Sequence, residues 1–426
     1  RYNIKILNSL PDNKERDILL ANVKRMRRQV RTNNCLNQIV DYLKGSRLVG
    51  NLELDKTPHL IPTKYGKVVD CKTGNIRNRI KEDYFSFELD FEYIPGQFGP
   101  FKEWLHSLFD LNNDSRQCEE FFQMLLGYFI TGSTVEQIFG IWLGNKGRNG
   151  KGVILNLLES VMGPFIYKMN KGLVIENEKC SNKGASLSKL VFSRLSYIDE
   201  TRKCDRFRDD FLKDISGEGV ITFRPLYQSE RTVHVNCKLL TVSNFAPNFD
   251  STDNAFVRRI LIIPFMKYFR QTFESDYIIN DKYCIAIGDN NFKYELMKHK
   301  DKFFNYVVAG AIKYYKNIGK LMKCLPKTFV QAKNDYIFQN DPVRQFIEEF
   351  CEVGENYKVP VSGFQTKLKK EYGLAKDYSS QIISRMMLDK GFNKKQHRTI
   401  YNDIGYNTKC YMGIRINPAE EEEDEF

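Results

Sequence analysis

Hydrophobic and polar positions alternate with different periods along the chain, and these periods predict its strands and helices. Short apolar runs of strand length occupy residues 137–143, 195–199, 238–243 and 260–265. Residues 118–130 and 302–316 instead repeat their apolar positions with the spacing of helices, the first of them amphipathic. Strands and helices alternate between residues 131 and 272, which predicts an α/β core built on a parallel sheet.

The segments on either side of this core have patterns of their own. Residues 64–76 alternate around the turn sequence Lys72–Asn75 and predict a β-hairpin. Asp341 and Pro342 are typical of an N-cap and a first helical residue, so we expect a helix and a small α+β unit to follow. The last residues, from Pro418 on, are acidic and low in complexity, and we expect them to be disordered.

The most informative segment joins the apolar run at residues 137–143 to a helical pattern. It reads Gly144-Asn145-Lys146-Gly147-Arg148-Asn149-Gly150-Lys151, which is the layout of a phosphate-binding loop. Glycines let the backbone wrap around an anion, and the following helix adds its positive N-terminal end. The candidate nucleotide-binding residues are Gly144, Gly147, Asn149, Gly150, Lys151, Gly152 and Val153. Because Lys151 would reach the outer phosphates, a nucleoside triphosphate is the first substrate to consider.

Two details depart from the usual loop. Gly144 lies one residue further from Gly150 than the usual spacing allows. Gly152 occupies the position where a Ser or Thr hydroxyl normally holds Mg²⁺. An alternative interpretation is a surface loop rich in Gly, Lys and Asn that binds no ligand, so the downstream sequence has to decide.

Polar side chains end two of the later strands. Asp199 and Glu200 follow the apolar run at residues 195–198, far enough beyond Lys151 for a helix and a return strand. In a phosphate-loop ATPase, such an Asp helps to hold Mg²⁺ and such a Glu polarises the attacking water. Asn244 ends the next strand and could hydrogen-bond the γ-phosphate or its water. The alternatives are a strand that merely ends in acids and an asparagine that only forms a turn.

Two further features could serve a ring-shaped ATPase. Arg258 and Arg259 precede the apolar strand at residues 260–265, and an arginine from one subunit can complete a neighbour's site. A surface arginine pair is the alternative. Residues 219–224 and 232–236 could pair as a hairpin, whose candidate DNA contacts are Arg224, Tyr227, Gln228 and Arg231. An ordinary surface hairpin is the alternative there.

Composition narrows the possible partners and protein classes but identifies no catalytic residue. The chain has 426 residues and a net charge of +12, which suggests a polyanionic partner, most simply nucleic acid, although compositional drift towards lysine would also produce it. Its ten cysteines form no CxxC pair, so the sequence supports neither a zinc ribbon nor a dithiol redox motif. A chain of this length does not need a disulfide framework, which favours a reducing compartment. No apolar run approaches the length of a membrane span. The start at Arg1 suggests a fragment.

The order of these motifs resembles superfamily 3 helicases, specifically the poxvirus-type and phage-type primase–helicase family. Further matches are Tyr65–Asp70, Leu125–Gly132 and Gly391–Lys395 with Tyr411–Arg415, so the resemblance covers residues 60–417. It implies an AAA+ DNA helicase that uses ATP and Mg²⁺ and works as a homo-hexamer on single-stranded or forked DNA. It also implies a primase region upstream of this chain, other viral replication proteins as partners, and replication sites in the host cytoplasm.

Carried over by position, the resemblance assigns a role to each candidate. Lys151 is the phosphate lysine, Asp199 the metal ligand, Glu200 the water-polarising carboxylate, Asn244 the sensor, and Arg259, with Arg258 second, the arginine finger. Lys213 would approach the neighbouring nucleotide. Gly152 puts direct Mg²⁺ ligation by a loop hydroxyl in doubt.

The resemblance also implies five parts. They are an N-terminal collar domain at residues 1–130, an AAA+ core at 131–272, a helical lid at 273–340, a winged-helix-like domain at 341–417 and the acidic tail at 418–426. Two rival functions stay open: a different DNA translocase, such as a packaging motor, and a non-enzymatic DNA-binding ring whose loop is disabled by Gly152.

Overall fold

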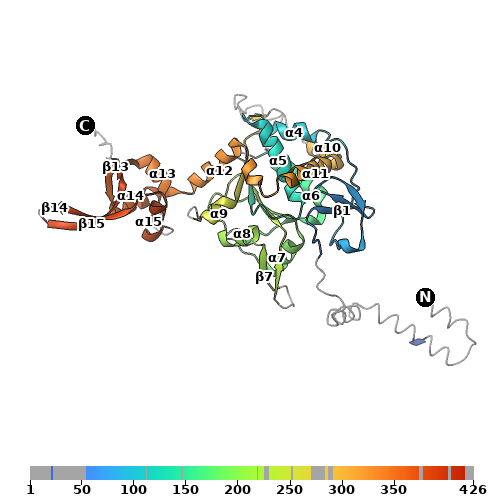
Figure 1. Ribbon diagram of the computed structural model, residues 1–426, viewed down its shortest axis with the longest axis horizontal. Coiled ribbons are helices and arrows are strands. Elements are labelled where there is room, and N and C mark those ends of the chain that lie inside the picture. The colour runs from blue at the N-terminus through green and yellow to red at the C-terminus, as the bar shows by residue number, and fades with distance from the viewer. Residues whose placement is uncertain are drawn as a thin grey trace, which may run out of the picture. The chain divides into compact units, whose positions relative to one another are not determined.

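The computed structural model describes residues 21–22, 54–111, 113–144, 147–217, 219–224, 230–250, 253–269, 284–285, 291–373, 378–401 and 404–417 (Figure 1). The chain divides into two compact units, residues 1–56 with 81–84 and residues 57–80 with 85–426. Most of the first unit and the whole acidic tail lie outside the described residues. The second unit contains the parallel sheet and every candidate site residue.

A five-stranded parallel sheet forms the centre of this second unit, as the apolar runs predicted. Its strands are β4 (Phe139–Gly144), β5 (Ile166–Lys168), β6 (Leu195–Asp199), β9 (Lys238–Ser243) and β10 (Ile260–Phe265). They lie in the order β10-β4-β9-β6-β5, and every neighbouring pair is parallel. The carboxyl ends therefore share one edge, and strands that follow β4 lie on both sides of it. Ligands of open α/β sheets bind at such a switch point.

Helices connect these strands, and most strand residues are buried. The helices are α6 (Lys151–Met162), α7 (Lys183–Phe192), α8 (Asp209–Ser216) and α9 (Asn254–Arg259), with the short 3₁₀ turns η2 (Gly163–Phe165) and η3 (Lys171–Leu173). Every residue of β9 and β10 is buried, as expected for strands covered on both faces. Trp142 of β4 is fully buried, and its ring contacts those of Phe122 and Phe265.

A second layer of helices packs on this core. This layer contains α4 (Phe101–Ser107), α5 (Ser115–Ile130), α10 (Phe292–Met297) and α11 (Lys300–Lys316), and the 3₁₀ turn η4 (Leu321–Cys324) follows α11. The 3₁₀ turn η1 (Lys81–Asp83) belongs to the first unit. The predicted helix at residues 118–130 is confirmed as part of α5. Its predicted amphipathicity is wrong from Phe121 on, because α5 is buried on every side there.

A small sheet, one hairpin and one parallel strand pair complete the described part before the C-terminal unit. The sheet consists of β1 (Leu60–Thr63), β2 (Lys67–Asp70) and β3 (Ile76–Asn78), and β2 and β3 form the predicted antiparallel hairpin. β7 (Val220–Phe223) pairs antiparallel with β8 (Arg231–His234), as the sequence predicted. β11 (Tyr268–Phe269) pairs with β12 (Cys284–Ile285). The buried guanidinium of Arg194 donates to the carbonyls of Leu60 and Ile130, which ties the small sheet to the core.

The C-terminal unit has its own hydrophobic core. After α12 (Lys327–Gln339) come α13 (Pro342–Phe350), β13 (Cys351–Pro360), α14 (Val361–Tyr372), α15 (Ser380–Asp389), β14 (Lys394–Tyr401) and β15 (Ile404–Ile416). The three strands form an antiparallel sheet in the order β13-β15-β14. Asp341 accepts a hydrogen bond from the backbone N–H of Arg344 at 2.9 Å, which confirms the predicted N-cap and the α+β character. No described helix combines the length and apolar character needed to cross a membrane.

The contact between α5 and α11 generates a stability prediction. A Cβ atom on Gly127 would lie 2.0 Å from the backbone nitrogen of Ala311, closer than any real contact. We expect Gly127→Ala to lower the free energy of unfolding by about 1–3 kcal/mol or more, because the two helices must separate. Gly363 in α14 has no atom within 4 Å of such a Cβ, so the control Gly363→Ala should raise it by about 0.5–1 kcal/mol. Denaturant titration of both variants measures the difference, and equal midpoints would contradict it.

Candidate nucleotide-binding site

The predicted phosphate-binding loop brings Asn149 and Lys151 close to Gly144, at the end of its own strand. β4 ends at Gly144 and α6 begins at Lys151, with Gly150 as its left-handed N-cap at φ 84°. A Cβ atom on Gly144 would lie 1.9 Å from the side-chain nitrogen of Asn149 and 2.3 Å from Nζ of Lys151. Both side chains therefore occupy the space above the strand end, and a Cβ atom at position 144 would force them to shift.

Lys151 is the centre of the site. Its side chain is buried, and its Nζ donates a hydrogen bond to Oδ1 of Asn244 at 2.9 Å. Burial lowers the pKa of Lys151 to about 8, because the charged form is poorly hydrated there. An amide oxygen compensates an ammonium group less than an anion does. The arrangement therefore favours a ligand that brings negative charge to Lys151, as the phosphates of a nucleotide would.

The sheet register brings the other predicted residues to the same edge. Leu143 of β4 pairs with Ser243 of β9, and Val242 of β9 pairs with Asp199 of β6. Asn244 and Glu200 follow directly after these strands. Ser243 Oγ accepts from the backbone N–H of Thr201 at 3.1 Å, which fixes the chain after Glu200 to the end of β9. The structure thus places the predicted sensor and both predicted carboxylates beside the loop.

Two lysines that the sequence interpretation missed hold the carboxylate segment. Lys168, the last residue of β5, forms an ion pair with Asp199 at 2.6 Å, and this hydrogen bond raises the pKa of Lys168. Lys171 donates to the backbone carbonyl of Glu200 at 2.6 Å. Glu200 is exposed and adopts a left-handed backbone with φ 56°. In the sequence, the available signal for this ion pair was Lys168 at the end of a short strand. It indicates a contact with Asp199 only once β5 is known to border β6.

The residues present fit a Mg²⁺ ion that also binds the nucleotide. Mg²⁺ is usually held by one or two carboxylates together with substrate phosphates and waters. Asp199 supplies such a carboxylate. In the described part of the chain, no cluster of three or more His, Cys, Asp and Glu side chains could hold a metal ion unaided. A Cβ atom on Gly152 would meet nothing within 4 Å. The place where a Ser or Thr side chain would begin is therefore open space.

The arginine pair lies at the opposite end of the sheet. Ile260 of β10 pairs with Phe139 at the start of β4, whereas Phe265 pairs with Gly144 at its end. Arg258 and Arg259 close α9 just before β10, so roughly 20 Å of strand separates them from the loop of their own subunit. Within one chain, the structure therefore does not bring the arginines to the phosphate-binding loop.

The predicted DNA contacts are only partly described. Arg224 is exposed directly after β7, and Arg231 begins β8 on the other side of the hairpin. Tyr227 and Gln228 lie outside the described residues. The hairpin itself is therefore confirmed, and the roles of its tip residues stay predictions.

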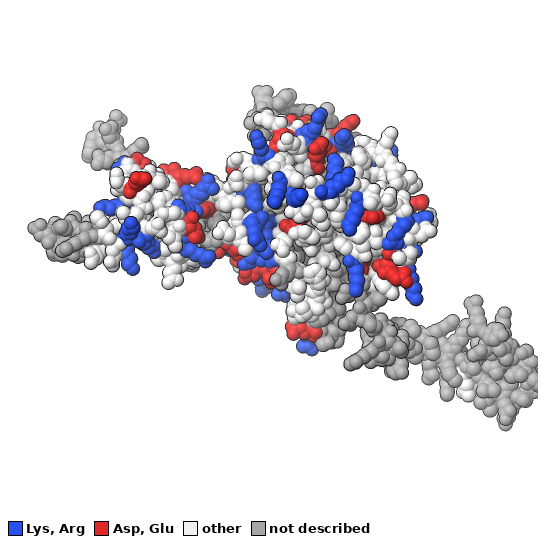
Figure 2. Space-filling model, in the orientation of Figure 1, with Lys and Arg blue, Asp and Glu red and all other residues white. Residues whose placement is uncertain are grey.

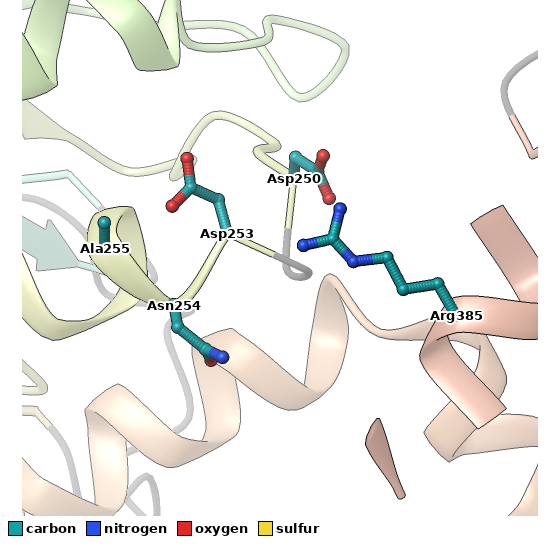
Figure 3. A pocket seen from close by; sticks show the side chains of 5 residues that line it. All are labelled: Asp250, Asp253, Asn254, Ala255 and Arg385. Atoms are coloured by element: carbon teal, nitrogen blue, oxygen red, sulfur yellow. The ribbon is translucent and has the colours of Figure 1, made fainter. Parts of the chain in front are cut away.

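A cavity of about 430 Å³ lies away from the phosphate loop. Its lining residues are Asp250, Asp253, Asn254, Ala255 and Arg385 (Figure 3). Two carboxylates in this lining do not favour a phosphate ligand, and none of the predicted nucleotide-binding residues takes part. The nucleotide site is thus defined by the loop and the strand ends and not by this cavity.

Two family models match the chain. Residues 142–259 match a family of unknown function, DUF5906, and this stretch runs from β4 to the arginine pair. Residues 4–110 match a family described as D5 N terminal like. The first match thus contains the whole candidate site.

Related proteins come from large DNA viruses. A protein of Acanthamoeba polyphaga mimivirus, L207/L206, whose name gives helicase as a provisional function, is 23% identical over 94% of this chain and 41% of its own length. C962R of African swine fever virus, provisionally named a primase, is 24% identical over 49% of this chain and 22% of its own. The fowlpox virus protein named Primase D5 is 25% identical over 64% of this chain and 36% of its own. The chain thus spans less than half the length of these relatives.

Among solved structures, an apo form of the NrS-1 C-terminal region aligns with 90% of each chain at 12% identity and a TM-score of 0.45, too weak a likeness to support a conclusion. The D5-type match and the viral relatives show that this chain is similar to proteins of large DNA viruses that are named helicase or primase. They confirm the resemblance of this chain to the viral primase–helicase family.

The open space at Gly152 generates a prediction about the metal. We expect Gly152→Ser to place a hydroxyl beside the loop without a clash, and so to lower the Mg²⁺ concentration needed for ATP binding. Gly152→Ala is the matched control, since it adds the same Cβ atom without a ligand. Fluorescent-nucleotide titrations at several Mg²⁺ concentrations measure the effect. An equal Mg²⁺ requirement in the Ser and Ala variants would show that the ion does not approach this position.

Proposed function

We propose that this chain is an ATP-driven DNA helicase of superfamily 3, with an AAA+ core, that works as a hexameric ring. One observation carries the proposal. Lys151, Asn244 and the Asp199–Glu200 pair meet at the carboxyl edge of the sheet, while the arginines lie at the opposite end. This layout supports an ATPase site that two neighbouring subunits would share.

The chemistry of hydrolysis follows from the positions of these side chains. Lys151 and the N-terminus of α6 would bind the phosphates of ATP, and Asn244 would exchange its bond to Lys151 for one to the γ-phosphate or the attacking water. Asp199 would leave Lys168 and hold Mg²⁺, which neutralises phosphate charge when it is bound. Glu200, exposed beside the strand end, would orient and polarise the water.

The arginine pair supports a ring. An arginine roughly 20 Å from its own loop can act only on another subunit's nucleotide, where it would stabilise the charge of the leaving phosphate. Arg258 is exposed, whereas the guanidinium of Arg259 donates to the carbonyl of Ala255 in its own helix at 2.8 Å. Exposure supports Arg258 as the arginine finger, although the sequence comparison favoured Arg259.

The DNA partner is supported by charge and by the relatives. Lysine and arginine side chains are numerous on the face shown in Figure 2, and the chain carries a net charge of +12. We propose that single-stranded DNA passes through the ring against the β7–β8 hairpin, with Arg224, Tyr227, Gln228 and Arg231 as its contacts. From the resemblance to the viral primase–helicase family, we also propose a primase region, other viral replication proteins as partners, and replication sites in the host cytoplasm.

A second function, a DNA-binding ring without catalysis, is favoured by two specific observations. Gly152 offers no hydroxyl to Mg²⁺, and the carboxylate of Asp199 is already paired with Lys168. Such a protein would assemble and bind DNA without turning over ATP.

ATP hydrolysis with and without single-stranded DNA separates the two functions. We expect DNA to stimulate the wild type, and Lys151→Ala to lower the rate by roughly a hundredfold or more, because the phosphates lose their cation. Lys320→Ala, which removes an exposed lysine outside the site, is the control and should keep the wild-type rate. Unwinding of a forked duplex then distinguishes a helicase from another translocase. Assembled, DNA-bound wild-type rings that hydrolyse no ATP would overturn the proposal in favour of the non-enzymatic ring.

A further inference from the structure

The hairpin proposed to touch DNA is joined to α8 by a tight glycine turn. The N–H of Gly219, at φ +66°, donates to the carbonyl of Asp214 at 3.0 Å, and the N–H of Val235 donates to the carbonyl of Gly219 at 2.6 Å. A Cβ atom on Gly217 would lie 2.7 Å from the carbonyl oxygen of Lys213. The glycine turn thus ties the end of α8 to the start of the hairpin through the residues on either side of Glu218, which lies outside the described residues.

An ion pair joins α8 to the helix that carries the arginine pair. Nζ of Lys213 lies 2.7 Å from Oδ2 of Asp253, and both side chains are about one-quarter exposed, at 27% and 25%. The other oxygen of Asp253 accepts from the backbone N–H of Phe256 at 3.0 Å and so caps α9. Asp253 therefore fixes the start of α9 and binds α8 at the same time. Hydrogen bonds to Asp253 and Asp210 raise the pKa of Lys213, which keeps the lysine charged.

The other end of α9 touches the glycine turn directly. A Cβ atom on Gly217 would lie 3.1 Å from Nη2 of Arg259, so the guanidinium rests against the turn. Nε of Arg259 is buried without a hydrogen-bond partner among the described residues, and burial lowers the pKa of this side chain. Both ends of α9 are thus in contact with the element that leads into the hairpin, while Arg258 faces solvent.

We propose that the ion pair between Lys213 and Asp253 is the positioning link that couples the arginine helix to the DNA-contacting hairpin. The inference rests on the proposed function. A nucleotide bound by the neighbouring subunit would shift α9 through its arginine, and the ion pair would pass that shift to α8. The glycine turn would convert it into a movement of the hairpin. DNA held at the hairpin would act on α9 by the same route in reverse, since coupling between two sites is reciprocal.

Asp210 provides a matched control, because it also binds Lys213. Its Oδ1 lies 2.9 Å from Nζ of Lys213, but it belongs to α8 itself, one turn away, and its side chain is 95% exposed. Asp253→Asn and Asp210→Asn each remove one negative charge from the same lysine. Only the first weakens a contact between two elements. Asparagine also serves as an N-cap, so Asp253→Asn should preserve α9.

The test compares DNA stimulation of ATP hydrolysis in the wild type and both variants. We expect Asp253→Asn to keep the basal rate, ring assembly and melting temperature while its stimulation by single-stranded DNA falls about fivefold or more. Asp210→Asn should keep the wild-type stimulation. In direct binding, the change in DNA affinity caused by a non-hydrolysable ATP analogue should also be smaller in Asp253→Asn than in the wild type.

Each other outcome has a definite meaning. Wild-type stimulation and analogue response in Asp253→Asn would overturn the inference and leave the proposed function intact. Equal losses in both variants would overturn it as well, because the effect would then be one of charge alone. A wild type that DNA does not stimulate would overturn the proposed function and this inference together.

Discussion

The ammonium group of Lys151, buried beside Asn244 at the carboxyl edge of the sheet, is the interaction on which the rest of the site depends. Burying an ammonium group without an anion is costly, and the pKa of about 8 expresses that cost. The sheet order makes the arrangement available, because β9 borders β4 and places Asn244 next to the loop. The site is therefore built to receive negative charge, and its polar groups converge on the place where phosphates would lie.

The same sheet separates the two halves of the proposed ATPase site. Parallel strands have distinct ends, so residues that follow a strand and residues that precede one lie on opposite edges. Asp199 ends β6 and Asn244 follows β9, whereas Arg258 precedes β10. Under the proposed function, a chain with this layout would complete its site with a second copy. Strand direction would then join assembly to catalysis.

The sequence was sufficient wherever chemistry depends on neighbours along the chain. The phosphate loop, the strand ending at Asp199 and the hairpin at residues 219–236 were all predicted, because glycine spacing and apolar runs are local signals. The pairing of Lys168 with Asp199 was not predicted, since it needs the strand order. Nor was the contact of Arg259 with Gly217, which requires two helices to be placed against each other. The burial of α5 on every side from Phe121 on likewise depends on α11, more than 150 residues later.

The most direct test of the central claim mixes two inactive proteins. One carries Lys151→Ala, and the other carries Arg258→Ala with Arg259→Ala. In mixed rings, some interfaces combine the intact loop of the second protein with the intact arginines of the first. The account predicts that ATP hydrolysis, low in each protein alone, recovers in the mixture. A mixture no more active than its two components, or full activity of the arginine variant alone, would contradict a site shared between subunits.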